Sequence, residues 1–214
     1  SRGLGDVYKR QTHDDMVKDL EESLKQLRTD YIDIYFYHRD NQEQTVEEEI
    51  ETMEQFVKEG KIRYYGCSNW DVERMVQADA YCKEKGYRGF VADQSLLNLG
   101  MKYMNPLADD TLGYIKGEAF DYHIKNTGNL AMPYMANCSG FFHIYDKLGE
   151  TGIQNNPYYT PENIQVAEGV KILKEKYHCS ITQVVLGFFY CQPFPCVPLY
   201  GTTKVEHIVD LSLI

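Results

Sequence analysis

Apolar residues along this chain switch repeatedly between helical spacing and strand spacing. In residues 14–27 they recur every three or four positions with charges between them, which predicts an amphipathic helix. Residues 31–37 form a short run of aromatic and β-branched residues that stops at His38, and such a run is typical of a strand buried on both faces of a parallel sheet. The alternation continues, and it predicts strands at 32–38, 62–67, 90–94, 130–135 and 196–200.

Polar residues mark the expected helix starts. Two capping boxes precede apolar helical stretches, Thr45 with Glu48 and Ser180 with Gln183. Asp71 precedes another such stretch, and we expect its side chain to cap that helix. The aromatic segment from Gly140 to Tyr159 carries no clear period and is expected to be a long loop, which in a compact domain is usually functional.

Repeated strand–helix alternation favours right-handed crossovers and a parallel sheet, either open or closed into a barrel. No Gly-x-Gly-x-x-Gly follows a predicted strand, which argues against an open dinucleotide-binding sheet. A polar group instead follows every predicted strand: His38, Ser68 and Asn69, Gln94, Tyr134, then Thr202 and Lys204. Because a barrel builds one site from successive strand ends, we predict an α/β protein with a (β/α) barrel architecture.

The composition of the chain argues against several classes of function. The 214 residues are enough for one sizeable core or for most of a larger single-domain fold, and the formal net charge of −10 argues against a nucleic-acid partner. No apolar run approaches the roughly 20 residues of a membrane span, and no secretory signal is evident. The six cysteines form no C-x-x-C pair, so we expect reduced thiols in a cytoplasmic protein. We predict no metal site.

The two ends of the chain are related at the level of DNA. A DNA sequence that encodes Asp6 to Gln11 has a reverse complement that encodes Leu211 to Ile214. Both ends resemble a transposon-end adapter used in sequencing libraries, and coincidence is the alternative. We therefore expect residues 1–11 and 211–214 to be adapter-derived, with a partial barrel domain at 12–210 that is open at both ends.

Three ordered motifs resemble the aldo-keto reductase family. They are Leu20 to Leu27 followed by Thr29 to Tyr35 and His38-Arg39, then Glu59 to Asn69, and finally Pro198 to His207. The resemblance covers nearly all of residues 12–210. It implies an eight-stranded TIM barrel, here incomplete, of which the chain would hold approximately strands four to eight with their helices.

The resemblance also implies residue roles around a nicotinamide. His38 would be the catalytic histidine that hydrogen-bonds the substrate carbonyl while negative charge develops on its oxygen. Ser68, Asn69 and Gln94 would hold the nicotinamide carboxamide, which their hydroxyl and amide groups suit. Tyr134 would stack on the ring, although ordinary barrel packing is the alternative for this residue.

Further resemblance concerns the phosphates of NADPH/NADP. Ser139 corresponds to a pyrophosphate-side contact, although residues 135–138 depart from the family's usual Ser-Pro-Leu pattern. The loop that holds the adenosine phosphate corresponds to Gly201, Thr202, Thr203 and Lys204, where a cation and hydroxyls favour NADP over NAD. His207 stands where the family often has arginine. A solvated charge is the alternative for Lys204.

The family's catalytic aspartate, tyrosine and lysine belong to the first strands of the barrel and would lie upstream of Thr12. We therefore expect the full-length protein to be an NADPH-dependent oxidoreductase of small-molecule carbonyl or alcohol substrates, and the chain itself to be an inactive fragment. Two alternatives stay open. One is a cofactor-binding regulatory subunit with little turnover, and the other is an unrelated barrel hydrolase, for which the sequence offers neither a metal cluster nor paired carboxylates at the strand ends.

Overall fold

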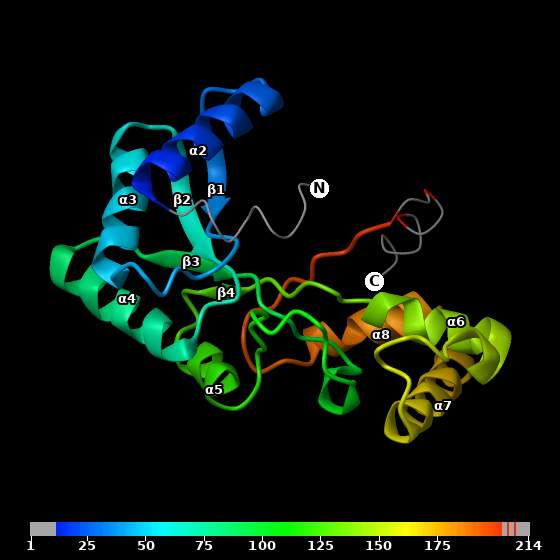
Figure 1. Ribbon diagram of the computed structural model, residues 1–214. Helices are drawn as coiled ribbons and strands as arrows, with labels where there is room; N and C mark the ends of the chain where they lie inside the picture. The colour runs from blue at the N-terminus through cyan, green and yellow to red at the C-terminus, as the bar shows by residue number, and fades with distance from the viewer. Residues whose placement is uncertain (1–11, 203–204, 206–207, 209–214) are drawn as a thin grey trace. The chain divides into compact units, whose positions relative to one another are not determined.

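A computed structural model describes residues 12–202, 205 and 208 of the chain (Figure 1). The chain divides into two compact units, Ser1–Gln94 and Ser95–Ile214. Of the predicted site residues, Thr203, Lys204 and His207 lie outside the described part.

The first unit alternates helices and parallel strands. Its elements are α2 (His13–Leu27), β1 (Ile32–Phe36), α3 (Val46–Lys58), β2 (Ile62–Cys67), α4 (Val72–Lys85) and β3 (Phe90–Asp93). Strand β1 pairs in parallel with β2, with Ile32 opposite Ile62, and β2 pairs in parallel with β3, with Tyr65 opposite Phe90. The predicted parallel order of the first three strands is confirmed, although β1 ends two residues before His38.

Side-chain caps explain where two of these helices begin. Thr12 Oγ1 accepts a hydrogen bond from the Asp15 backbone N–H at 3.3 Å, and Thr45 and Glu48 form the predicted capping box at the start of α3. Asp71 occupies the N-cap position of α4 but makes no cap hydrogen bond. The prediction for Asp71 is therefore wrong, because its carboxylate accepts from Gln42 Nε2 at 3.1 Å instead.

The two faces of the first sheet differ in burial. On the face packed against helices, Tyr65 is 1% exposed and its hydroxyl donates to Glu54 Oε1 of α3 at 2.8 Å. On the opposite face Ile34 and Tyr64 are 37% and 39% exposed. The prediction that the first strand is buried on both faces is wrong for β1, because the helices of this unit cover one face of the sheet only.

The second unit is mostly helical. Its elements are η1 (Met101–Tyr103), α5 (Glu118–Lys125), β4 (Leu130–Ala131), η2 (Cys138–Gly140), α6 (Phe141–Leu148), η3 (Gly149–Gly152), α7 (Pro161–Tyr177) and α8 (Ile181–Tyr190). One of its cores forms where α6, α7 and α8 pack together, with Phe141 and Val185 fully buried. Parallel bridges join Leu96 to Tyr134 and Ala131 to Cys196.

Two predicted strands of this unit are shorter than expected. The strand predicted at 130–135 ends at Ala131, because Pro133 has no N–H to donate to a ladder. The strand predicted at 196–200 is reduced to the bridge at Cys196, although Leu199 N–H still donates to Pro133 O at 2.8 Å. The two segments therefore run in parallel as predicted, with less regular pairing.

The segment from Gly140 to Tyr159 is not the long loop that the sequence predicts. It contains α6, whose Phe141 and Phe142 are 0% and 1% exposed, followed by η3. An eight-residue helix spans barely two turns, so its apolar period is too short to separate from an irregular aromatic stretch.

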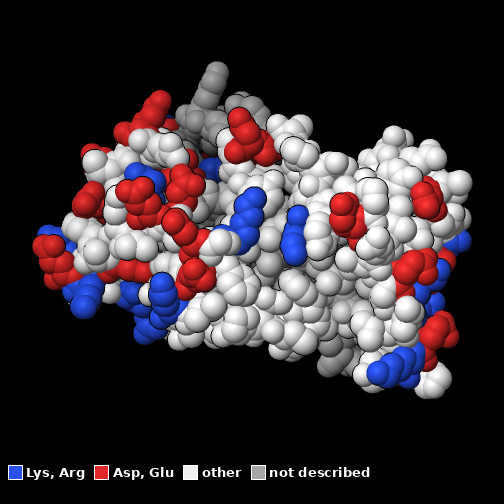
Figure 2. All heavy atoms as spheres, turned by 90° about the horizontal axis from the view of Figure 1, so that it is seen from below, with Lys and Arg blue, Asp and Glu red and all other residues white. Residues whose placement is uncertain are grey.

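The surface carries charges of both signs. Figure 2 shows acidic and basic side chains close to one another on the face that it presents. Ion pairs occur among the described residues, and in one of them Lys61 Nζ lies 2.7 Å from Glu21 and 2.9 Å from Glu59. Among the helices of the described residues, none combines the length and the apolarity that a membrane crossing requires.

Candidate functional site

The carboxyl ends of the first unit's strands are joined by side-chain hydrogen bonds. Ser68 Oγ, just after β2, donates to the backbone oxygen of Gln94 at 2.6 Å. Asn69 Nδ2 donates to Ser68 Oγ at 2.9 Å and to the backbone oxygen of His38 at 3.3 Å. The structure thus brings together the four predicted site residues that belong to this unit.

Asn69 lies at the centre of this group. Its φ of 59° is in the left-handed region, which asparagine tolerates better than most residues, and it is 7% exposed. Because its two Nδ2 hydrogens are used within the protein, the side chain could act toward a ligand only through Oδ1. A glutamine or aspartate here would change the reach or the donors that hold the strand ends together.

His38 and Gln94 are the more accessible members of the group. His38 is exposed, and Gln94 is half-buried. The side-chain amide of Gln94 forms no hydrogen bond with any described residue. An imidazole and a primary amide can therefore both face a ligand at this edge of the sheet.

The thiol behind these strand ends is not a nucleophile. Cys67 is fully buried at the end of β2, with Sγ 3.9 Å from Asp93 Oδ1. Burial, and then the nearby Asp93 carboxylate, raise the pKa of the Cys67 thiol well above its ordinary value. The thiol stays protonated at neutral pH, as expected for a structural cysteine.

The second unit holds the remaining described candidates. Tyr134 is half-buried and bridges in parallel to Leu96, and Ser139 is exposed in η2, with its backbone oxygen accepting from Asn156 Nδ2 at 3.3 Å. Gly201 is exposed and Thr202 is half-buried. These residues lie on separate segments of the second unit, around residues 134, 139 and 201–202.

The segment before α6 has an unusual backbone. Met135, Cys138 and Ser139 have φ values of 55°, 51° and 51°, in a region that non-glycine residues rarely occupy. Cys138 anchors the segment, because its buried Sγ donates to Asn98 Oδ1 at 3.2 Å. Burial raises the pKa of this thiol to about 12, so Cys138 is also a structural residue.

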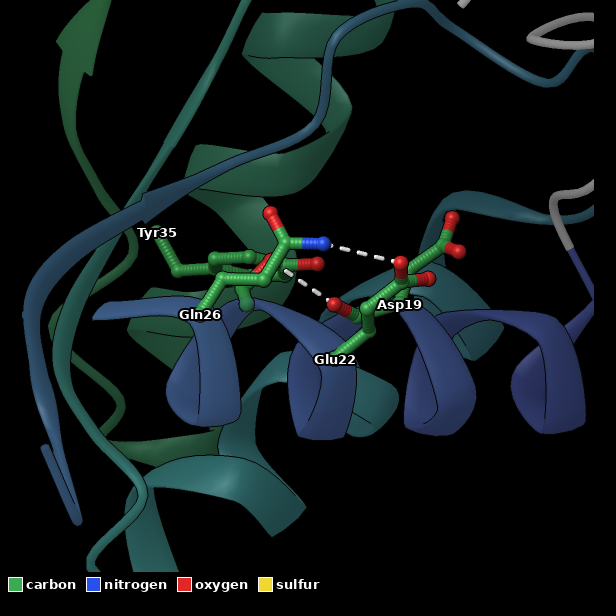
Figure 3. A pocket seen from close by; sticks show the side chains of 5 residues that line it. Asp19, Glu22, Gln26 and Tyr35 are labelled. Carbon is green, nitrogen blue, oxygen red and sulfur yellow. Dashed lines mark hydrogen bonds between the residues drawn. The ribbon is translucent and has the colours of Figure 1, made fainter. Parts of the chain in front are cut away.

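A polar cavity lies between α2 and the helix side of β1 (Figure 3). It measures about 270 Å³ and is lined by Asp19, Glu22, Ser23, Gln26 and Tyr35. Burial and the Asp19 carboxylate raise the pKa of Tyr35 to about 12. Gln26 Nε2 donates to Glu22 at 2.9 Å and Ser23 Oγ to the Asp19 backbone oxygen at 2.7 Å, so the lining groups largely satisfy one another.

Sequence reasoning missed a buried charged cluster next to His38. Arg74 of α4 binds Asp40, two residues after His38, and Glu49 of α3. A signal was available for Glu49, which stands beside Ile50 in the apolar stripe of its helix. No local signal identifies Arg74 as its partner.

The fold and the site together define a class of protein. Parallel strands with crossover helices carry a histidine, a hydroxyl and two amides at their carboxyl ends, which is where α/β folds bind small molecules. The family model for the aldo/keto reductase family matches residues 3–212. The chain belongs to the aldo/keto reductase family.

Two curated proteins are similar to most of the chain. An aryl-alcohol dehydrogenase [NADP(+)] of Phanerodontia chrysosporium is 28% identical over 91% of the chain and 52% of its own length. A "Probable voltage-gated potassium channel subunit beta" of Oryza sativa subsp. japonica is 21% identical over 97% of the chain and 63% of its own length. The chain thus spans between half and two thirds of the length of these relatives.

Solved structures share the fold. A thermostable aldo-keto reductase in complex with the inhibitor epalrestat superposes with a TM-score of 0.67 at 23% identity, covering 94% of the chain and 61% of that protein. An aldo/keto reductase from Klebsiella pneumoniae in complex with NADP and acetate gives a TM-score of 0.66 at 20% identity, covering 92% of the chain and 58% of that protein.

Proposed function

We propose that the chain is part of an NADPH-dependent reductase of small-molecule aldehydes or ketones. The observation that carries the proposal is the hydrogen-bonded group of His38, Ser68, Asn69 and Gln94 at the carboxyl ends of parallel strands. Membership of the aldo/keto reductase family and the NADP-bound Klebsiella relative support the choice of cofactor. Six free thiols among the described residues support a cytoplasmic location.

The donors and acceptors at the strand ends fit a nicotinamide carboxamide. A carboxamide offers one carbonyl acceptor and two N–H donors. Gln94 Nε2 can donate to the carbonyl oxygen of the carboxamide, and Asn69 Oδ1 can accept from one of its N–H groups. Ser68 Oγ donates its hydrogen to the protein and can only accept a further bond. Bound NADPH would supply a hydride to the carbonyl carbon of the substrate.

His38 would act on the substrate oxygen. The exposed imidazole would donate a hydrogen bond to the carbonyl, which strengthens as charge develops on oxygen during the transfer. We propose that Tyr134 stacks on the nicotinamide and that Ser139, Gly201, Thr202, Thr203, Lys204 and His207 contact the phosphate and adenosine portions. Lys204 and the neighbouring hydroxyls would favour NADP over NAD.

We further propose that residues 12–210 correspond to the later strands of an incomplete barrel and that the chain alone does not turn over. The proton donor of the family, a tyrosine, is assigned to none of the described residues. Strand β1 also ends the sheet order and carries partly exposed Ile34 on its uncovered face, as expected if further barrel strands normally lie beside it.

The test compares the chain with a hybrid that adds the N-terminal strands of the Phanerodontia relative before residue 12. Aldehyde-dependent loss of NADPH absorbance should be absent for the chain and present for the hybrid. His38→Ala in the hybrid should lower kcat about a hundredfold, as expected for loss of a group that stabilises the developing oxyanion. Turnover by the bare chain would show that the chemistry has been assigned to the wrong residues.

A regulatory, cofactor-holding subunit is the second candidate. Similarity to the potassium channel subunit beta of rice favours it. The same hybrid separates the two functions. If the protein is regulatory, the hybrid should bind NADPH, but excess aldehyde should oxidise the bound NADPH only slowly in a single turnover.

A further inference from the structure

One arginine ties the segment after His38 to two helices. Arg74 Nε of α4 donates to Asp40 Oδ1 at 2.8 Å, and its Nη2 donates to Glu49 Oε2 of α3 at 2.7 Å. Nη2 also lies 3.2 Å from the backbone oxygen of Gln44 and 3.4 Å from that of Asn41. The side chains of Arg74, Asp40 and Glu49 are 17%, 6% and 0% exposed, so the cluster is shielded from water.

These contacts bracket His38 on both sides. Tyr37, the residue before it, donates its hydroxyl to the backbone oxygen of Glu49 at 2.9 Å. Asp40, two residues after it, is bound to Arg74. A segment held at both of these points leaves the imidazole between them little freedom to shift, and sub-ångström placement matters for hydrogen bonding to a reacting carbonyl.

The charges in the cluster do not balance if both carboxyl groups ionise. One guanidinium then faces two carboxylates in a buried setting, which leaves an uncompensated negative charge. Asp40 Oδ2 is buried and has no hydrogen-bond partner among the described residues, and Glu49 Oε1 accepts only a long bond, 3.4 Å, from the Asn41 N–H. One proton kept by the pair would remove the excess charge.

Electrostatics agree with a retained proton. Burial, and next the Asp40 carboxylate, raise the pKa of Glu49 to about 8, while Arg74 acts in the opposite direction. Burial also raises the pKa of Asp40, again opposed by Arg74, with Asp71 of the α4 N-cap adding to the rise. Among the described residues, the Asn41 N–H also donates to Glu49 Oε1, and the phenol of Tyr37, whose pKa burial and Glu49 raise, lies close to Glu49.

We propose that Arg74, Asp40 and Glu49 form a proton-dependent positioning cluster for His38. The cluster holds the 39–45 segment while the two carboxyl groups share one proton, and its hold loosens when both ionise. The inference deepens the proposed function, because it rests on the role of His38 there. Arg74, Asp40 and Glu49 act through the segment and are positioning residues.

The test follows the ring resonances of His38 by NMR in the full 214-residue chain. The resonances are assigned by their loss in His38→Ala, and the pH is raised from about 5 to about 10, a range that spans histidine and the cluster. We expect a second inflection near pH 8, apart from the titration of the ring itself. Glu49→Gln should remove that inflection, and Arg74→Gln should shift the ring signals across the whole range.

Arg63→Gln is the matched control. It removes an exposed arginine–aspartate pair of the same unit, in which Arg63 Nη1 lies 2.8 Å from Asp33 Oδ1, and should leave the His38 titration unchanged. A general loss of stability would not produce this pattern, since it cannot delete a single inflection. If Arg74→Gln fails to fold, Glu49→Gln alone decides the outcome.

The proposal is overturned if His38 shows one inflection in the wild-type chain, or if the second inflection persists in Glu49→Gln. Binding of NADPH is measured on the same samples by fluorescence. Absence of binding with the inflection pattern intact would contradict the proposed function and leave the cluster standing. Binding of NADPH without the inflection pattern would contradict the positioning cluster and leave the proposed function standing.

Discussion

Tyr65 and Tyr64 are neighbours on β2 whose side chains lie on opposite faces of the sheet. Tyr65→Phe removes the hydroxyl that satisfies Glu54, which is only 8% exposed, and should lower the free energy of unfolding by about 1–3 kcal/mol. Tyr64→Phe, at a 39% exposed position, should change it by less than about 0.5 kcal/mol. Urea unfolding measures both, and equal losses would contradict the burial difference.

Glu49 makes stability depend on pH. Its pKa is raised from 4.5 to about 8 in the folded chain, chiefly by burial, so the folded state holds the proton more tightly than the unfolded state. Stability from this group is therefore complete below about pH 4.5 and is lost as the pH rises to about 8. Relative to Glu49→Gln, the wild-type free energy of unfolding should fall by on the order of 4 kcal/mol over that range. A parallel pH dependence of the two proteins, measured by urea unfolding, would rule this out.

Single residues differ in how far the sequence reveals them. The grouping of His38, Ser68, Asn69 and Gln94 could be predicted, because each follows a recognisable strand and the ends of parallel strands meet at one edge. Arg74 could not be predicted, because its partners come from two segments that are 25 and 34 residues away along the chain. Local patterns carry no information on such long-range pairing.

At the scale of elements, glycine-to-alanine variants compare the tight packing around β2 with the open space beside α7. A Cβ built on Gly66 of β2 would lie 2.4 Å from the Phe36 ring and 2.6 Å from the Ala92 backbone oxygen, so Gly66→Ala should destabilise the chain by about 1–3 kcal/mol. A Cβ on Gly169 of α7 meets nothing within 4 Å, and Gly169→Ala should stabilise the chain by about 0.5–1 kcal/mol. Thermal unfolding of both variants gives the signs, and the same sign for both would contradict the packing described.

The helix caps give a second comparison between elements. Thr45 caps α3 through a complete capping box, so Thr45→Ala should cost about 1 kcal/mol of stability. Asp71 has the N-cap backbone but no cap hydrogen bond, so Asp71→Ala should cost clearly less in the same urea titration. The sequence alone predicts that Thr45 and Asp71 both cap a helix, because it does not show that the Asp71 carboxylate accepts a hydrogen bond from Gln42 Nε2.

At the scale of the whole molecule, the alternation of strands and helices could be predicted from the spacing of apolar residues, and the family from the resemblance of three ordered motifs. The lengths of the later strands could not, because Pro133 interrupts the ladder beside Ala131 and only one bridge forms at Cys196. In the aromatic segment at 140–159 the sequence predicts a loop where the structure has a helix. Burial of Phe141 and Phe142 accompanies this helix, which is too short for its apolar period to be recognised in the sequence.

The proposed function requires a nicotinamide cofactor to bind at the strand ends of the chain. NMR titration of the isotope-labelled chain with NADP⁺ tests this directly through the side-chain amide signals of Asn69 and Gln94. Both signals should shift and saturate, while the amide of Gln26, in the polar cavity on the helix side of β1, should not move. Unmoved Asn69 and Gln94 signals at saturating NADP⁺, or a shift confined to Gln26, would contradict the proposed site.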